Sequence, residues 1–204
     1  MISPQFVCVA VLLAGSAMAA SPAAPTSPAS FPITDKSFKC ITELTHVRHF
    51  YVGNLAGNLA GTVKVAQAGT GDYPVGSVLQ LVPNEVMVKR EKGFNATTHD
   101  WEFFDLNISP TESSIRTRGF QEVNNRFGGN CFNCHVKARA EFDLVCDNSH
   151  GCDPIPFTRA MSGALQRTDP RCKNNPPVSA EDAAALAQLG AIVKAMAAGS
   201  APKQ

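Results

Sequence analysis

The chain has 204 residues, of which 44% are hydrophobic and 17% charged, and its formal net charge is +1. This length and composition predict one globular domain of ordinary size. A charge balance so close to neutral gives no basis for a nucleic acid or an anionic membrane surface as partner.

The first 35 residues are typical of an export signal followed by a tether. An apolar run ends before Ala17-Met18-Ala19, which has the small-x-small pattern of a cleavage site, although no Lys or Arg precedes the run. We therefore predict a signal peptide over 1–19 and a disordered leader, rich in Ala, Ser and Pro, over 20–35. The run is shorter than the roughly 20 apolar residues of a membrane helix. These features predict a periplasmic or otherwise exported chain without a membrane span.

The rest of the chain is expected to form one domain over 36–172, followed by a C-terminal helix and tail over 173–204. Runs of β-branched and aromatic residues predict at least five strands, over 46–52, 78–82, 85–89, 100–104 and 114–118. In the third of these strands, Val86 and Val88 should face one side of the sheet and Met87 the other. The tetrapeptide Asn-Leu-Ala-Gly occurs twice in succession from Asn54, which predicts a loop.

Residues 131–135 read Cys-Phe-Asn-Cys-His, the Cys-x-x-Cys-His attachment pattern of a c-type haem. Cys131 and Cys134 lie about one helical turn apart, so both thiols can form thioethers with the two vinyl groups along one porphyrin edge. His135 then supplies the proximal ligand to the iron. Its other ring nitrogen should donate to a carbonyl or carboxylate, which fixes the tautomer. Asn130 is a plausible cap for this helix. The motif predicts one covalent haem c.

Three other uses of the same residues fit the sequence less well. A thioredoxin-like dithiol would follow a strand in a βαβ pattern, which the sequence does not show. A structural zinc site needs a second ligand pair at finger-like spacing, which the later cysteines do not offer. A simple disulfide between Cys131 and Cys134 would leave His135 without a role. Export and the adjacent histidine together favour haem attachment.

The other cysteines of the exported part are even in number. Excluding Cys8 of the signal and the two motif cysteines leaves four, which in an oxidising compartment predicts two disulfides. Three pairings are possible. We favour Cys146 with Cys152, which closes a small loop, and Cys40 with Cys172, which ties the two ends of the domain.

Helices are expected after the motif. The motif helix should continue over 136–145, and further helices should cover 158–166 and begin at Ser179. An apolar stripe at helical spacing in the last helix should dock on the sheet or on another copy of the chain. The stripe consists of Leu186, Leu189, Val193 and Met196.

The predicted class is α+β, mainly an antiparallel β-sheet, with a haem-bearing helix after the strands and a C-terminal helix.

The order of several segments resembles that of the cytochrome P-460 family, including its cytochrome c′-β branch. The segments are YPVGSV (73–78), VMVK (86–89), DWEFF (100–104), the Cys-x-x-Cys-His motif and DLV (143–145). The resemblance covers roughly residues 45–145. It implies a mainly antiparallel β fold, one c-type haem and a five-coordinate iron with an open distal side. It also implies either hydroxylamine and nitric oxide oxidation or the binding of small gaseous ligands.

The resemblance also implies roles for individual residues. The haem-binding residues of the family fall on Cys131, Cys134 and His135, and a distal arginine matches Arg48. The lysine that cross-links to the macrocycle in the family's enzymes falls on Leu81. The c′-β branch, with an apolar cap over the iron, therefore fits better than the hydroxylamine-oxidising enzymes, and an oxidoreductase activity stays open. Leu81 and Phe50 are the candidate capping residues. Relatives in this family are dimeric, which implies a possible homodimer.

A sixth protein ligand would instead give a dedicated electron carrier with a periplasmic redox partner. A methionine there would raise the reduction potential and fill the open position. Trp101 and His150 are expected to be structural, Trp101 as a core anchor near the haem. The candidate sixth ligands are Met87, Met161, His46, His49, His99 and His150.

Overall fold

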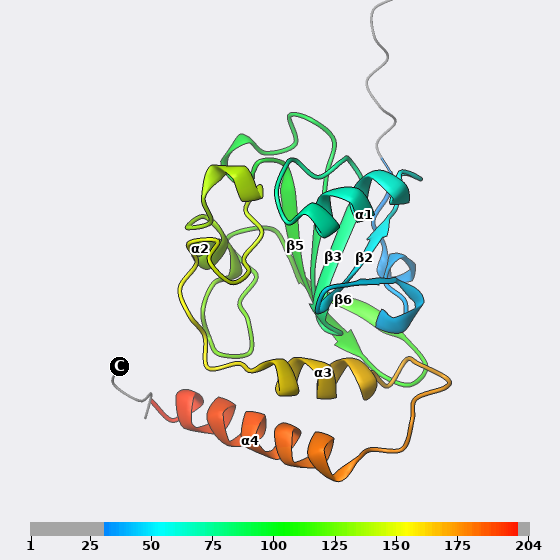
Figure 1. Ribbon diagram of the computed structural model, residues 1–204, viewed down its shortest axis with the longest axis vertical. Helices are drawn as coiled ribbons and strands as arrows, with labels where there is room; N and C mark the ends of the chain where they lie inside the picture. Colours follow the sequence, from blue (N-terminus) through cyan, green and yellow to red (C-terminus); the bar gives the residue numbers. More distant parts are fainter. Residues whose placement is uncertain (1–30, 200–204) are drawn as a thin grey trace, which may run out of the picture.

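The computed structural model describes residues 31–199, and the predicted signal peptide over 1–19 lies outside them. Within this part of the chain, six strands form one antiparallel sheet in which each strand pairs with its neighbour in sequence (Figure 1). The predicted α+β class is confirmed. The strands are β1 (Thr45–Val47), β2 (Phe50–Asn54), β3 (Ser77–Val82), β4 (Glu85–Lys89), β5 (Trp101–Ile108) and β6 (Ser113–Arg118). The α-helices are α1 (Leu59–Ala68), α2 (Cys131–His135), α3 (Arg159–Arg167) and α4 (Ala180–Ala197).

Both faces of the sheet carry apolar side chains. Val86 and Val88 of β4 belong to the cluster on one face, and Met87 belongs to the cluster on the other, as the strand alternation predicts. The cluster on the Met87 face is the larger one, and Cys131 and Phe132 of α2 pack against it. The sheet therefore presents an apolar face to the helix that carries the Cys-x-x-Cys-His motif.

The strand predicted over 46–52 is instead a hairpin. Val47 of β1 pairs with Phe50 of β2, so the chain reverses at the two residues between them. Arg48 adopts the left-handed conformation, with φ 56°. The β-branched and aromatic residues on both sides of this turn gave the appearance of one continuous strand, because neither Gly nor Pro marks the reversal.

The second Asn-Leu-Ala-Gly copy begins helix α1 and is not a loop. Asn58 caps the helix, since its side chain accepts from the backbone N–H of Gly61 at 3.0 Å. The helix ends at Gly69, which has φ 72°. The first copy begins with Asn54, the last residue of β2. Identical tetrapeptides thus lie in different structures because only the second is followed by a run that can pack as a helix.

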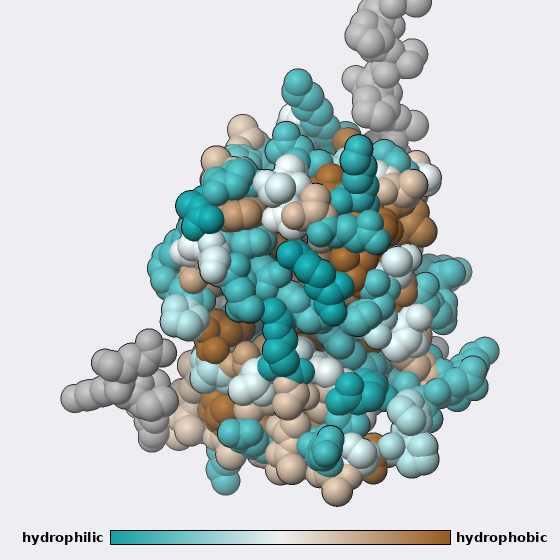
Figure 2. All heavy atoms as spheres, in the orientation of Figure 1, coloured by the Kyte–Doolittle hydropathy of each residue, from teal (hydrophilic) through white to brown (hydrophobic). Residues whose placement is uncertain are grey.

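Helices α3 and α4 lie side by side below the sheet in Figure 1. Met161 and Ala164 of α3 are fully buried against Ala185 and Leu189 of α4. Of the predicted apolar stripe, Leu186, Leu189 and Val193 belong to this contact, so the stripe docks on α3 and not on the sheet. No helix within residues 31–199 combines the length and apolarity that crossing a membrane requires. The face of the molecule drawn in Figure 2 mixes hydrophilic teal residues with tan and brown hydrophobic ones.

The packed part of the chain begins earlier than predicted. The expected leader, over 20–35, overlaps the described residues only from Phe31 onward. There Ile33 is buried in the cluster that contains Val86 and Val88. Asp35 accepts a hydrogen bond from the backbone N–H of Ile115 at 2.7 Å. These contacts attach residues 31–35 to the sheet, so the leader's last five residues belong to the domain.

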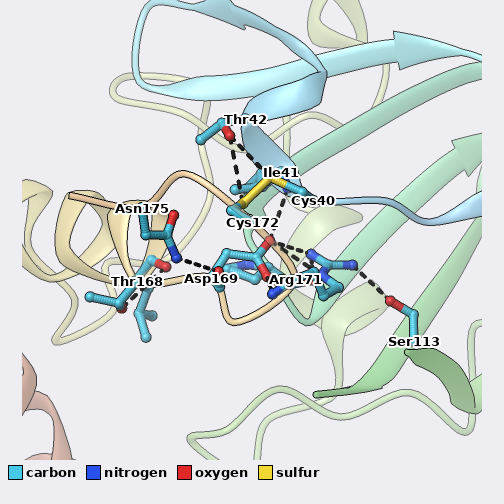
Figure 3. Close-up of a disulfide and its surroundings, with 11 residues drawn as sticks. Cys40, Ile41, Thr42, Ser113, Thr168, Asp169, Arg171, Cys172 and Asn175 are labelled. Carbon is cyan, nitrogen blue, oxygen red and sulfur yellow. Dashed lines mark hydrogen bonds and ion pairs between the residues drawn. A yellow bond between two sulfur atoms is a disulfide. The ribbon is translucent and has the colours of Figure 1, made fainter. Parts of the chain in front are cut away.

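The disulfide between Cys40 and Cys172 joins the start of the domain to the segment after α3 (Figure 3). Beside it, the fully buried carboxylate of Asp169 accepts from the backbone N–H of Ile41 at 2.9 Å and from Nη2 of Arg171 at 2.7 Å. The Arg171 guanidinium also donates to the first residue of β6 and to the turn between β3 and β4. This cluster therefore connects four segments that are distant in sequence.

Candidate haem-attachment site

Helix α2 is held at its start by Asn130. The side-chain oxygen of Asn130 accepts from the backbone N–H of Asn133 at 3.0 Å, which confirms the predicted cap. Its amide nitrogen donates to the backbone oxygens of Phe120, Gln121 and Val123 at 3.0–3.1 Å. One side chain thus both caps the helix and fixes it to the loop that follows β6.

The two motif cysteines are the unpaired ones among residues 31–199. The other four form the disulfides Cys40–Cys172 and Cys146–Cys152, which confirms the favoured pairing. Burial raises the pKa of Cys131 to about 12, and it also raises the pKa of Cys134. Both thiols are therefore neutral near pH 7, and neither is consumed by a structural disulfide.

The imidazole of His135 is oriented by a backbone carbonyl. Its Nδ1 lies 2.7 Å from the oxygen of Leu144. Because a carbonyl oxygen only accepts hydrogen bonds, Nδ1 carries the proton and Nε2 is left with a free lone pair. Burial lowers the pKa of His135, and this favours the neutral ring that a metal ion requires. This is the arrangement predicted for a proximal haem ligand.

The carbonyl of Leu144 reaches His135 through an unusual bend. The motif helix ends at His135 and does not continue over 136–145 as predicted. Asp143 and Leu144 follow in successive left-handed conformations, with φ 47° and 60°. Non-glycine residues rarely adopt such φ values, and a β-carbon makes them unfavourable. The bend therefore needs support from the surrounding structure.

That support centres on the buried carboxylate of Asp143. Nζ of Lys89 donates to both of its oxygens, at 2.7 and 2.8 Å, and the backbone N–H of Tyr73 donates at 2.9 Å. Nε1 of Trp101 donates to the backbone oxygen of Asp143 at 2.8 Å. Trp101 is 1% exposed, so the predicted core anchor is confirmed. Strands β4 and β5 thereby hold the residue that precedes the Leu144 carbonyl.

The apolar face of the sheet lies next to the motif. Cross-strand pairs align Val52, Leu79, Met87 and Phe103 in one row across β2 to β5. The ring of Phe103 lies 5.2 Å from the ring of His135 in an edge-on arrangement. Two unpaired thiols, an oriented imidazole and an adjoining apolar face are the donors and surroundings that fit a covalent haem. Cys131, Cys134 and His135 would hold it.

The three predicted distal residues come together at one end of β2 and β3. Phe50 is buried in the cluster that contains Phe103, and Leu81 packs against this cluster. The Arg48 guanidinium lies 5.5 Å from the centroid of the Phe50 ring. It also lies 3.4 Å from the carboxylate of Asp147, and its side chain is 34% exposed. Arg48 is therefore in the turn beside the cluster and already has a charged partner.

The two methionines considered as sixth iron ligands lie in different apolar clusters. Met87 lies in the row beside Phe103, on the face next to the motif. Met161 is fully buried between α3 and α4, in a separate cluster. Only Met87 therefore lies on the same apolar face as the motif.

Each histidine considered as a sixth iron ligand contacts an aromatic ring, a carboxylate or a backbone oxygen of another residue. His150 stacks on Phe142 at 3.7 Å, and its Nδ1 lies 2.6 Å from the oxygen of Val145, as expected for a structural histidine. His46 packs on Tyr51, and Nε2 of His49 lies 3.4 Å from Asp147. The side chain of His99 is 52% exposed and lies 3.9 Å from Asp143.

Lys89 and Asp143 were missed as positioning residues. Both lie within segments that carry the family resemblance, but a lysine at the end of a strand and an aspartate in a presumed helix gave no sign of a mutual contact. The pairing joins residues that are 54 positions apart, so it depends on how the loop after α2 returns to the sheet.

Alanine in place of Asn130 should lower the free energy of unfolding by about 1–2 kcal/mol, because it removes a cap and leaves three backbone oxygens without this donor. It should also lower the yield of covalent haem, since α2 loses its fixed start. Chemical denaturation and the haem-to-protein absorbance ratio measure the two effects. Asn58→Ala, which removes the cap of α1, is the matched control. It should cost similar stability with haem yield unchanged, and equal haem yields in both variants would contradict the role of Asn130.

No family model, curated protein or solved structure matches the chain. The likeness to the cytochrome P-460 family therefore rests on the order of its short segments.

Proposed function

We propose that the chain is an exported monohaem c-type cytochrome whose iron binds small gaseous ligands such as nitric oxide and carbon monoxide. The observation that carries the proposal is the hydrogen bond from Nδ1 of His135 to the Leu144 carbonyl, next to two unpaired thiols. Cys131 and Cys134 bind the vinyl groups as thioethers, and Nε2 of His135 is the proximal ligand. The bound haem supplies an iron that exchanges one electron and takes a diatomic ligand.

The protein's contribution is to fix the proximal side. The Nδ1–H···O hydrogen bond increases electron donation by the imidazole and prevents its rotation. Asp143, held by Lys89 and Trp101, keeps the carbonyl in place. A neutral, rigid imidazole is the ligand type that globins and peroxidases use for a five-coordinate iron.

The ligand side is proposed from the resemblance and from packing. Phe50 and Leu81 supply an apolar cap, as expected for the c′-β branch, and Arg48 stands at its edge against Asp147. A guanidinium near a polarised ligand would stabilise negative charge where water is excluded. The two disulfides are compatible with an oxidising compartment, and we place the protein in the periplasm. We propose in addition that the protein forms a homodimer and exchanges electrons with a periplasmic redox partner.

The second candidate is an electron carrier with Met87 as the sixth ligand. The position of Met87 on the face next to the motif favours it. Hydroxylamine oxidation is third, because Leu81 occupies the position that the resemblance assigns to the cross-linking lysine.

Optical and spin-resonance spectra of the purified haem protein separate these candidates. The proposal predicts high-spin iron and rapid binding of carbon monoxide to the ferrous form. Met87→Leu should leave both unchanged, as should Met161→Leu, which alters a methionine in a different cluster. A low-spin spectrum that refuses carbon monoxide until Met87 is replaced would overturn the proposal in favour of electron transfer. A red-shifted Soret band with hydroxylamine turnover would favour the third candidate.

A further inference from the structure

Cys134 lies against the disulfide that follows the motif. The sulfur atoms of Cys134, Cys146 and Cys152 are all within 4.8 Å of one another. A free thiol thus lies next to a disulfide to which it does not belong.

The neighbouring groups narrow the chemistry available to these three sulfurs. A metal site would need all three as thiolates, and two are joined in a disulfide. Cys131 is absent from the cluster, because it packs against the sheet and its backbone N–H donates to Val123. The reaction open to a thiol beside a disulfide is exchange.

We propose that Cys134 of the haem-free chain undergoes internal thiol–disulfide exchange with the Cys146–Cys152 bond, and that haem attachment ends this exchange. In the small fraction of molecules in which the Cys134 thiol is ionised, its proton passes to water and the thiolate sulfur attacks one disulfide sulfur. The Cys146–Cys152 bond breaks as the new bond forms, and the released sulfur takes the electron pair and then a proton. One disulfide and one thiol are present before and after, so no outside oxidant or reductant is needed.

The exchange has a consequence for maturation. While Cys134 is in a mixed disulfide, it has no thiol to add to a vinyl group. Once its sulfur is a thioether, it no longer attacks the Cys146–Cys152 bond. The loop disulfide and the haem linkage are therefore completed together. This last step rests on the proposed function, whereas the exchange itself does not.

The test uses the full chain exported from cells that lack a haem-ligation system. Cys131→Ser leaves Cys134 as the single motif thiol, and Cys131→Ala gives the same readout if serine disturbs the apolar site. The native protein is incubated with iodoacetamide, and its alkylated and disulfide-linked peptides are mapped by mass spectrometry. We expect label on Cys134 and also on Cys146 or Cys152, with the matching mixed disulfide to Cys134.

The control is Cys134→Ser, in which label on Cys146 and Cys152 should be lost and Cys131 alone should react. Label confined to Cys134 in the Cys131 variants, with the Cys146–Cys152 bond intact throughout, would overturn the proposal. Label on Cys146 or Cys152 that persists in Cys134→Ser would overturn it as well. A separate arm uses wild-type protein with covalent haem, in which none of these cysteines should react. If the haem assignment is wrong, this arm alone fails, because the haem-free arms do not depend on it.

Discussion

Asparagine in place of Asp143 should lower the free energy of unfolding by about 3–5 kcal/mol, the usual cost of removing one partner of a buried ion pair. The Asp143 side chain is 1% exposed and that of Lys89 is 12% exposed, so the variant leaves the Lys89 ammonium in a poorly solvated place. The left-handed bend at Asp143 and Leu144 also loses its main support. Denaturant unfolding monitored by Trp101 fluorescence measures the loss.

The same variant tests whether Asp143 positions His135, the proposed proximal ligand. If the Leu144 carbonyl is displaced, the hydrogen bond from Nδ1 of His135 to it becomes weaker. The imidazole then gives less electron density to the iron. The reduction potential of the haem protein should therefore rise, which a purely structural role would not require. Glu141→Gln is the control, because the Arg139–Glu141 pair is exposed, at 55% and 51%. It should leave both the free energy of unfolding and the potential close to those of the wild type, because an exposed ion pair contributes little to stability. Equal stabilities and equal potentials for the two variants would contradict a positioning role for Asp143.

Replacing Cys40 and Cys172 with alanine should destabilise the protein by about 5 kcal/mol, from the chain entropy of the loop that the disulfide closes. The cysteines are 132 residues apart, whereas Cys146 and Cys152 are separated by 6. Removing the shorter bridge should therefore cost only about 2 kcal/mol on the same basis. The thermal midpoints of the two double variants should differ clearly. A larger loss from the shorter bridge would show that native-state contacts, and not loop entropy, set the stability.

The sheet was predictable where short apolar runs rich in β-branched residues end at turn-forming residues. Residues 78–82 and 85–89 are such runs, separated by Pro83 and Asn84, and β3 and β4 form there. The reversal at Arg48 was missed, because a turn without Gly or Pro looks like a strand interior. Helix α1 was missed because Gly57 and Gly61 break the helical pattern in the sequence, although only Gly61 lies inside the helix.

The site was predictable only in its local part. The spacing of Cys131, Cys134 and His135 is contained in five residues, and a partner for the second imidazole nitrogen follows from ligand chemistry alone. That this partner is Leu144 depends on the chain reversing after His135, where a continuing helix was expected. The reversal is stabilised by contacts from β4 and β5, which no local pattern reveals.

Covalent haem attachment is tested most directly by acid–acetone extraction of the protein after export alongside a working haem-ligation system, with the intact mass measured beforehand. We expect the pigment to stay with the polypeptide and the mass to exceed that of the mature chain by one haem. The variant with both Cys131→Ser and Cys134→Ser should be exported without covalent pigment. Wild-type protein that is colourless, or that loses its pigment to the solvent, would contradict covalent haem attachment at Cys131 and Cys134.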